Sequence, residues 1–260
     1  MYDLNAICEE VKKISIEAGN AIMEIYQNEE SFGVTHKKDD SPLTIADGKA
    51  NQIICDNLVK LTPNIPIISE ENKEIEYSER KSFEYAWLVD PLDGTKEFIK
   101  RNGDFTVNIA LLHNGKTVMG VVYIPVTEAV YSAIYGEGAH ETVDGKTTKL
   151  EAPKFGMKDK GIGVVCSRSH LNEGTANFIA QLNEPEKVSR GSSLKFLILA
   201  KGEAHVYPRL APTMEWDTGA AQIILEEAGG KVISEETKQP LAYNKENLLN
   251  PHFVAYGNVQ

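Results

Sequence analysis

The sequence predicts an α/β (α+β) fold in which two lobes pack as alternating layers of helix and sheet. Three observations predict it. Apolar residues recur with helical spacing along the first 25 residues, β-rich runs follow one another from Thr106 to about Leu150, and strands then alternate with helices. These three sequence patterns cover most of the chain, so we expect one compact unit without linkers or repeats.

Two helices are expected in the N-terminal part. The first is indicated by residues that recur every three or four positions: Leu4, Ile7, Val11, Ile14, Ala18, Ile22 and Ile25. The second is expected from about Leu43 to Leu61, and the residues expected to face inward are Ile45, Ile53, Ile54, Leu58 and Leu61. It begins inside "DDSPLTIAD", where Pro42 suits a first helical turn. Asp47 then lies early in this helix.

Strands are expected next. "IPII" leads into "SEEN", and "AWLVD" leads into "PLDGT". "TVNIALLH", "TVMGVVYI" and "EAVYSAIY" are separated by Asn114-Gly115 and by Pro125. Asn-Gly between apolar runs is a strong hairpin signal, so this region predicts an antiparallel meander.

The second half alternates. The strands "GIGVVCS", "KVSRG" and "AHVYPRL" are followed by the helices "TANFIAQL", "SLKFLILAKG" and "DTGAAQIILEEAGG", the last closed by glycines. This pattern predicts a mixed α/β lobe. We expect an N-terminal lobe over residues 1–155 and a C-terminal lobe over residues 156–260.

Composition limits the classes of partner. The 260 residues carry a formal net charge of −11, and an acidic surface repels nucleic acid. The longest apolar run, "FLILA", is far shorter than the roughly 20 residues of a membrane span. Cys8, Cys55 and Cys166 are scattered among apolar neighbours, which favours reduced buried thiols in a reducing compartment. We therefore expect a cytoplasmic monomer or weak dimer, with peripheral association at the inner membrane face left open.

Acidic residues occur at strand ends or helix starts in three separate places. Glu70 and Glu71 follow "PIIS", Asp90 and Asp93 follow "AWLV", and Asp217 follows "TMEW". Two bare carboxylates at about 4 Å cost roughly 4 kcal/mol at an effective dielectric near 20, and a divalent cation removes that conflict. All candidate ligands are hard oxygens, which favours Mg²⁺, with Mn²⁺ able to substitute.

The "DPLDGT" spacing fits this interpretation. We expect Pro91 to fix a turn, so that Asp90 and Asp93 both point into the cleft with the Leu92 carbonyl free to ligate between them. Gly94 and Thr95 then supply backbone N–H groups at the start of a possible helix, where they would cradle a phosphate.

The joint pattern of S-E-E, D-P-L-D-G-T and W-D-T-G-A-A resembles the lithium-sensitive, magnesium-dependent phosphatase family that contains inositol monophosphatase, fructose-1,6-bisphosphatase and the bisphosphate nucleotidases. The resemblance runs from "DDSPLTIAD" to "GGKV" and implies the layered αβαβα sandwich. It also implies two or three Mg²⁺ held by Glu70, Asp90, the Leu92 carbonyl, Asp93 and Asp217. Asp47 and Thr95 would orient and deprotonate the attacking water, with Glu70 completing the catalytic set.

Within this family the segments "DGTKEFIKRNGDFTVNIAL", "SRSH", "GSSLKF" and "VYPRLAPTMEWDT" are most similar to the 3′(2′),5′-bisphosphate nucleotidases. This implies removal of the 3′-phosphate of adenosine 3′,5′-bisphosphate to give AMP, and of the sulfated form of this nucleotide, in sulfur assimilation. The residues implied to bind substrate are Glu70, Leu92, Asp93, Gly94, Thr95, Ser167, His170, Gly191, Ser192, Lys195, Arg209 and Asp217. Among these, Arg209 would bind the second phosphate. Arg168 and Arg190 would extend a cationic rim around the site, the alternative being that both are solvated surface charges.

Two alternatives stay open, and a third is disfavoured. An inositol or sugar phosphate phosphatase would keep the same fold, and a nucleotide- or metal-sensing domain would keep it without catalysis. A haloacid-dehalogenase-type phosphatase needs D-x-D-G-T, and Pro91 stands where its nucleophilic aspartate would be. A sensor needs no water activator, so the Asp47 and Thr95 pair argues against it.

Overall fold

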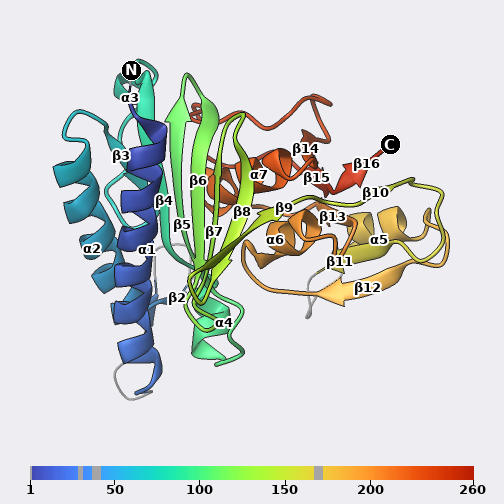
Figure 1. Ribbon diagram of the computed structural model, residues 1–260, viewed down its shortest axis with the longest axis horizontal. Coiled ribbons are helices and arrows are strands. Elements are labelled where there is room, and N and C mark those ends of the chain that lie inside the picture. Colours follow the sequence, from blue (N-terminus) through green and yellow to red (C-terminus); the bar gives the residue numbers. More distant parts are fainter. Residues whose placement is uncertain (1, 29–31, 37–41, 167–171) are drawn as a thin grey trace.

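Five layers stack across the molecule in the order αβαβα (Figure 1). The structure is a computed structural model, and it describes residues 2–28, 32–36, 42–166 and 172–260. The first helical layer holds α1 (Leu4–Tyr26) and α2 (Ile45–Leu61), the central one α6 (Leu194–Ala200) and α7 (Gly219–Glu227), and the last one α5 (Glu173–Ile179). The layered fold predicted from the sequence is confirmed.

The first sheet has seven strands in the order β3-β4-β5-β6-β7-β8-β9. Its strands are β3 (Ile67–Ser69), β4 (Tyr85–Asp93), β5 (Thr106–His113), β6 (Lys116–Ile124), β7 (Ala129–Ile134), β8 (Gly138–Val143) and β9 (Lys146–Leu150). Neighbours from β4 to β9 pair antiparallel, as the predicted meander requires, while β3 pairs parallel with β4. The Asn114-Gly115 hairpin is also confirmed, because both residues adopt the positive φ that its turn needs (50° and 72°).

Strand β4 does not end where the sequence suggested. It continues through "PLD" to Asp93, and its register against β5 shifts between Asp90 and Asp93. The expected turn at Pro91 is therefore wrong, and a β-bulge takes its place. Proline lacks the N–H that a regular ladder needs, so a bulge is one of the few places in a sheet where it fits.

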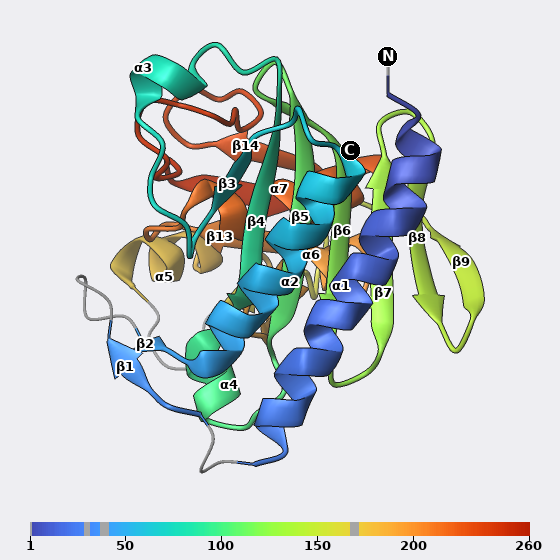
Figure 2. The ribbon, with the colours of Figure 1, turned by 90° about the vertical axis from the view of Figure 1, so that its left-hand side faces the viewer.

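Helices α1 and α2 lie across one face of this sheet (Figure 2). Side chains alternate along β4, so that Trp87 and Val89 pack against these helices while Leu88 packs on the opposite face. Helix α2 begins at Ile45 with Thr44 as its N-cap, and Pro42 lies before it in the short strand β2 (Pro42–Leu43), paired with β1 (Thr35–His36). The two expectations that Pro42 opens the helix and that Ile45 faces inward are thus wrong.

The exposure of Ile45 has a local reason. It is 55% exposed, whereas Ala46 and Asp47 in the same helical turn are buried, so Ile45 lies on the side of α2 that faces away from the core.

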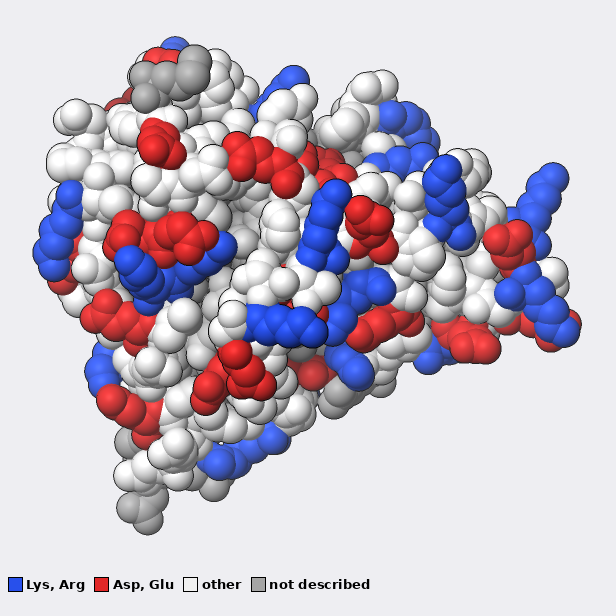
Figure 3. Space-filling view, viewed as in Figure 1, with Lys and Arg blue, Asp and Glu red and all other residues white. Residues whose placement is uncertain are grey.

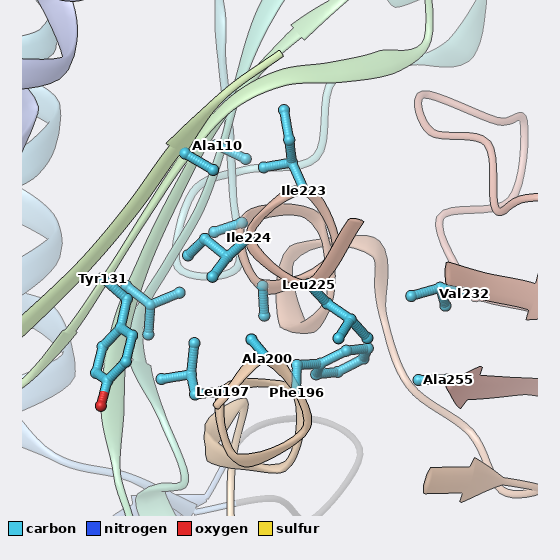
Figure 4. Close-up of a cluster of buried hydrophobic side chains, with 14 of the residues drawn as sticks. Ala110, Tyr131, Phe196, Leu197, Ala200, Ile223, Ile224, Leu225, Val232 and Ala255 are labelled. Atoms are coloured by element: carbon cyan, nitrogen blue, oxygen red, sulfur yellow. The ribbon is translucent and has the colours of Figure 1, made fainter. Parts of the chain in front are cut away.

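The central layer joins the two sheets into one core. Ile223, Ile224 and Leu225 of α7 and Leu197 of α6 fill the space between Tyr131 on the first sheet and Val232 on the second (Figure 4). All six side chains are buried. The elements that carry the two halves of the chain therefore share a single apolar contact surface.

The second sheet is mixed, as predicted, with strands in the order β12-β11-β13-β15-β14. Its strands are β11 (Gly163–Cys166), β12 (Glu186–Ser189), β13 (Val206–Arg209), β14 (Lys231–Ser234) and β15 (Phe253–Tyr256). The first three in this order are parallel, and β15 pairs antiparallel with both β13 and β14. The sequence did not predict β14 or β15.

Short elements complete the fold: α3 (Tyr77–Arg80), α4 (Thr95–Ile99), the 3₁₀ turn η2 (Glu215–Asp217), and the paired strands β10 (Lys154–Phe155) and β16 (Asn258–Val259). None of the described helices combines the length and the apolar character needed to cross a membrane. Cys8, Cys55 and Cys166 are free thiols, and Cys55 is only half-buried. On the face seen in Figure 3 acidic and basic side chains are interspersed.

Candidate active site

Three carboxylates from separate elements meet at one point. Glu70 follows β3, Asp90 lies in β4, and Asp217 ends η2. One oxygen from each lies within 4.8 Å of the other two, and Asp90 is buried. The structure thus brings together three of the residues that the sequence placed in a metal site.

The electrostatics of this cluster favour a bound cation. Burial, followed by the charges of Glu70, Asp93 and Asp217, raises the pKa of Asp90 well above its ordinary value. Burial, followed by the charge of Asp93, raises the pKa of Asp217 to about 8. Carboxylates placed in this way cannot all ionise at neutral pH without a compensating positive charge. An all-oxygen donor set fits a hard divalent cation such as Mg²⁺.

Local hydrogen bonds orient the side chains of Asp90 and Asp217. The Leu92 N–H donates to Oδ1 of Asp90 at 3.0 Å, and the Met214 N–H donates to Oδ2 of Asp217 at 2.9 Å. Each carboxylate therefore uses one oxygen to hold a backbone N–H close to it in sequence. The first contact lies in the bulge of β4 and the second at η2, both between residues close in sequence, so both side chains are oriented before any ligand binds.

Asp93 lies beside this cluster and is held from the other half of the chain. The Ser193 N–H donates to its Oδ2 at 2.5 Å, and the side chain of Asn108 on β5 donates to the same oxygen at 3.4 Å. Burial raises the pKa of Asp93, while the charge of Lys195 acts against that rise. The segment before α6 thus touches a predicted metal ligand directly.

Buried hydroxyl groups support this contact. The Ser193 hydroxyl donates to Oδ1 of Asn108 at 2.8 Å and lies 2.8 Å from the Thr106 hydroxyl. Ser192, which has a positive φ of 51°, brings its own hydroxyl within 2.7 Å of Thr106. This network fixes the "GSS" segment against β5.

Thr95 and Asp47 also meet, although they are far apart in sequence. The Thr95 hydroxyl lies 3.0 Å from Oδ1 of Asp47, which is buried near the start of α2, and 3.4 Å from the carbonyl of Leu92. A hydroxyl in this position can pass its proton to the carboxylate as it takes one from a water molecule.

Gly94 is required where the strand turns into α4. Its φ is +97°, and a Cβ at this position would lie 2.9 Å from the carbonyl oxygen of Asp104. Both the conformation and the space favour glycine. The predicted helix after "DG" is therefore present as α4, and Gly94 is its N-cap.

A cavity of about 410 Å³ opens beside the carboxylates. The predicted site residues that line it are Asp93, Gly191, Ser192, Lys195, Arg209 and Asp217. Lys96, Lys100 and Arg190 add further positive charge to its walls. Glu70 instead lines a neighbouring cavity of about 660 Å³ together with Trp216, so the carboxylate cluster lies between two hollows.

The two main cations differ in how they are held. Lys195 donates to the carbonyl of Ser192 at 2.7 Å and lies 5.5 Å from the centre of the Tyr207 ring. Arg209 donates one guanidinium N–H to the carbonyl of Pro212 at 2.7 Å, while its buried Nε has no hydrogen-bond partner within the described part of the chain. Because Nε is enclosed, any N–H group that Arg209 offers to a ligand in the cavity belongs to its terminal guanidinium nitrogens.

Two predicted contacts cannot be placed. Ser167 and His170, with Arg168, lie outside the described residues. The sequence prediction also passed over residues that touch the site: Thr44, Thr106, Asn108 and Ser193. The sequence contains an indication of a role for Asn108, because it is the one amide side chain inside the apolar run "TVNIALL". It contains another for Thr44, which stands three residues before Asp47 in the spacing of a helix cap.

Known proteins are similar to this chain over almost its whole length. Residues 4–257 match the inositol monophosphatase family. The 3′(2′),5′-bisphosphate nucleotidase CysQ of Escherichia coli K12 is 43% identical over 247 residues, covering 94% of this chain and 97% of that protein. CysQ of Haemophilus influenzae is 34% identical, covering 99% and 96%.

Solved structures agree. The crystal structure of CysQ from Bacteroides thetaiotaomicron, a bacterial member of the inositol monophosphatase family, has a TM-score of 0.85 at 40% identity and covers 98% of both chains. An inositol monophosphatase from Anabaena has a TM-score of 0.77 at 22% identity, covering 99% of this chain and 93% of that one, which shows the shared fold alone.

Proposed function

The chain belongs to the inositol monophosphatase family, and we propose that it is a metal-dependent 3′(2′),5′-bisphosphate nucleotidase. It removes the 3′-phosphate of adenosine 3′,5′-bisphosphate to give AMP, and of the sulfated form of this nucleotide, as a step linked to sulfur assimilation. One observation carries the proposal: the carboxylates that converge within 4.8 Å reach, through Asp217, a cavity whose walls also carry five lysine and arginine residues. A bisphosphate needs both features.

The metal site we propose is built from Glu70, Asp90, the Leu92 carbonyl, Asp93 and Asp217. Two or three Mg²⁺ would occupy it, and Mn²⁺ can substitute. When bound, the metal supplies positive charge against the scissile phosphate and the developing negative charge on the leaving oxygen. The chain contributes the oriented oxygens, because Asp90 and Asp217 are each held by a backbone N–H.

Water activation is assigned to Thr95 and Asp47. The Thr95 hydroxyl takes a proton from the attacking water and passes its own to Oδ1 of Asp47, 3.0 Å away. Glu70, which lines the second cavity, is the further carboxylate of the catalytic set.

Substrate is held on the other side of the cluster. Gly94 and Thr95 receive the scissile phosphate. Gly191 and Ser192 frame the nucleotide, and Arg209 binds the second phosphate through the terminal guanidinium N–H groups that it does not give to Pro212. A guanidinium suits a phosphate because its N–H groups match two oxygens at once. Lys195 adds charge at this wall, and Ser167 and His170 are proposed to contact the nucleotide.

The setting of the enzyme completes the proposal. Three free cysteines are typical of a protein from a reducing compartment, which supports a cytoplasmic location. We keep a monomer or weak dimer as the working assembly. We also keep the division into lobes near residue 155, with Asp217 contributed by the second lobe.

A substrate panel tests the assignment. Phosphate release is measured from adenosine 3′,5′-bisphosphate, its sulfated form, inositol 1-phosphate and fructose 1,6-bisphosphate, each with and without Mg²⁺. We expect the two nucleotides to have the highest kcat/KM, and only with metal. A higher value for inositol 1-phosphate or fructose 1,6-bisphosphate would move the chain to the sugar-phosphate branch of its family. No turnover of any of the four with metal would favour the sensing domain.

A further inference from the structure

Thr44 holds the carboxylate of Asp47 through two donors. Its backbone N–H lies 2.7 Å from Oδ2 of Asp47, and its hydroxyl lies 2.5 Å from the same oxygen. Both residues are buried, with 3% and 1% of their surfaces exposed. A carboxylate oxygen only accepts, so the Thr44 hydroxyl is the donor.

The second carboxylate oxygen faces the opposite partner. Oδ1 of Asp47 accepts from the Thr95 hydroxyl at 3.0 Å. The plane of the carboxylate therefore lies between a threonine of its own helix cap and a threonine on α4. Oδ2 is therefore held by Thr44, while Oδ1 is the oxygen that meets Thr95.

This arrangement matters because the terminal torsion of aspartate is soft. The rotation of a carboxylate about its bond to Cβ has broad wells, so the rotamer alone does not fix where Oδ1 points. Two donors on Oδ2 restrain that rotation. A small error in the position of a reacting group can cost about a hundredfold in rate. The contact with Thr44 thus bears on how well Oδ1 meets Thr95.

We propose that Thr44 is a positioning residue of the hydrolytic reaction, whose hydroxyl orients Asp47 toward Thr95 in addition to capping α2. This inference rests on the proposed function, because it deepens the assignment of Asp47 and Thr95 to water activation. The competing explanation is that Thr44 only caps the helix, and the two make different predictions.

The test compares Thr44→Val, which keeps the shape and removes the hydroxyl, with Thr44→Ser, which keeps the hydroxyl. We expect Thr44→Val to lower kcat about 10- to 100-fold, with KM changed less than about twofold. Thr44→Ser should recover to within about threefold of wild type. The Mg²⁺ concentration for half-maximal activity should not change, because no proposed metal ligand is touched.

A second comparison asks whether Thr44 acts through the pair. In a Thr95→Ala background, Thr44→Val should lower kcat by less than a further factor of about two. The reason is that the Thr95 hydroxyl toward which Thr44 orients Asp47 is already missing. Asp3→Ala is the matched control: Asp3 caps α1 by accepting from the Ala6 N–H, and it lies outside the site. It should lower the melting temperature without changing kcat.

Four kinetic outcomes overturn the inference. They are a normal kcat in Thr44→Val, an equal loss in Thr44→Ser, a multiplicative loss in the Thr95→Ala background, and a similar fall of kcat in Asp3→Ala. If Thr44→Val does not fold, Thr44→Gly serves in its place, since glycine is about as good an N-cap as threonine.

A crystal structure separates this inference from the proposed function. In Thr44→Val, Oδ1 of Asp47 should turn away so that its distance to Thr95 exceeds about 3.5 Å. An unchanged carboxylate would overturn the positioning role. If the wild-type protein turns over none of the four substrates, the proposed function fails, and this comparison alone still decides what Thr44 does.

Discussion

The Thr95 hydroxyl donates to Oδ1 of Asp47 across 3.0 Å, although the two residues are 48 positions apart in the chain. The contact joins α4 to the first turn of α2. It gives the proposed nucleotidase a hydroxyl that can relay a proton only as long as the carboxylate accepts one.

The first prediction concerns this pair. Asp47→Asn and Thr95→Ala should each lower kcat by about a hundredfold or more, because either change interrupts the same proton transfer. The double variant should be scarcely slower than the slower single variant, since the two residues act as a unit. Steady-state kinetics of the four proteins measures this, and multiplicative losses would show that the residues work independently.

The second prediction concerns the metal ligands. Asp93→Asn and Asp217→Asn should each lower kcat about a thousandfold or more, roughly 4 kcal/mol of barrier. The reason is the lost charge at a site where negative charge develops on the leaving oxygen. Both variants should fold, because relief of carboxylate repulsion favours the metal-free protein. Asp144→Asn, in the exposed turn between β8 and β9, is the matched control. A variant with near-normal turnover would remove that residue from the site.

The third prediction concerns the metal itself. Excess chelator should abolish activity, Mg²⁺ should restore it, and Ca²⁺ should inhibit because it takes longer bonds and looser geometry. Family resemblance adds inhibition by Li⁺. Phosphate release and calorimetric titration of the chelated protein measure activity and binding separately. Full activity in chelator would refute the metal mechanism.

The fourth prediction concerns pH. The pKa of Asp217 is raised from 3.8 to about 8 in the folded protein, mainly by burial. Between these values the folded protein binds a proton that the unfolded chain has lost, so the free energy of unfolding falls as pH rises. The melting temperature of the chelated protein should therefore decrease from about pH 5.5 to about pH 8.5, and Mg²⁺ should raise it most at the upper end.

Asp217→Asn provides the comparison for that measurement. Because this variant lacks the titrating group, its melting temperature in chelator should fall less than that of the wild type over the same pH interval. An identical slope in the variant and the wild type would mean that Asp217 does not titrate there.

The fifth prediction concerns the second phosphate. Arg209→Ala should lower kcat/KM for adenosine 3′,5′-bisphosphate by a factor that corresponds to about 2–4 kcal/mol of transition-state stabilisation. This is the size expected for the loss of charge-assisted hydrogen bonds. Slow hydrolysis of a substrate with a single phosphate should barely change. The exposed Lys238, which pairs with Glu235 at 3.0 Å, supplies the control Lys238→Ala.

Equal losses on both substrates would give Arg209 another role. Its charge acts to lower the pKa of Asp217, which burial raises, so it lies within electrostatic reach of the carboxylate cluster. In that case it would contact the scissile phosphate or hold the structure, and the nucleotidase assignment would lose its main mechanistic support.

Elements that are caused by neighbouring residues could be predicted from the amino-acid sequence. The spacing from Leu4 to Ile25 gave α1, Asn114-Gly115 gave the hairpin, and Gly94 gave the turn into α4. The sequence also predicted the chemistry of the donor set, because Glu70, Asp90 and Asp217 are hard oxygen ligands wherever the fold places them. Periodicity, turn conformation and ligand type are properties of neighbouring residues, so they can be read along the chain.

Which of these residues come into contact depends on how distant segments pack in the folded protein. Ser193 reaches Asp93 across 100 positions, β3 pairs parallel with β4, and Pro91 lies in a bulge inside a continuing strand. Each depends on the register and stacking of layers that form between distant segments. The same is true of Asp47: its position near a helix start is local, but its carboxylate lies between Thr44 and Thr95 because α2 packs where α4 begins.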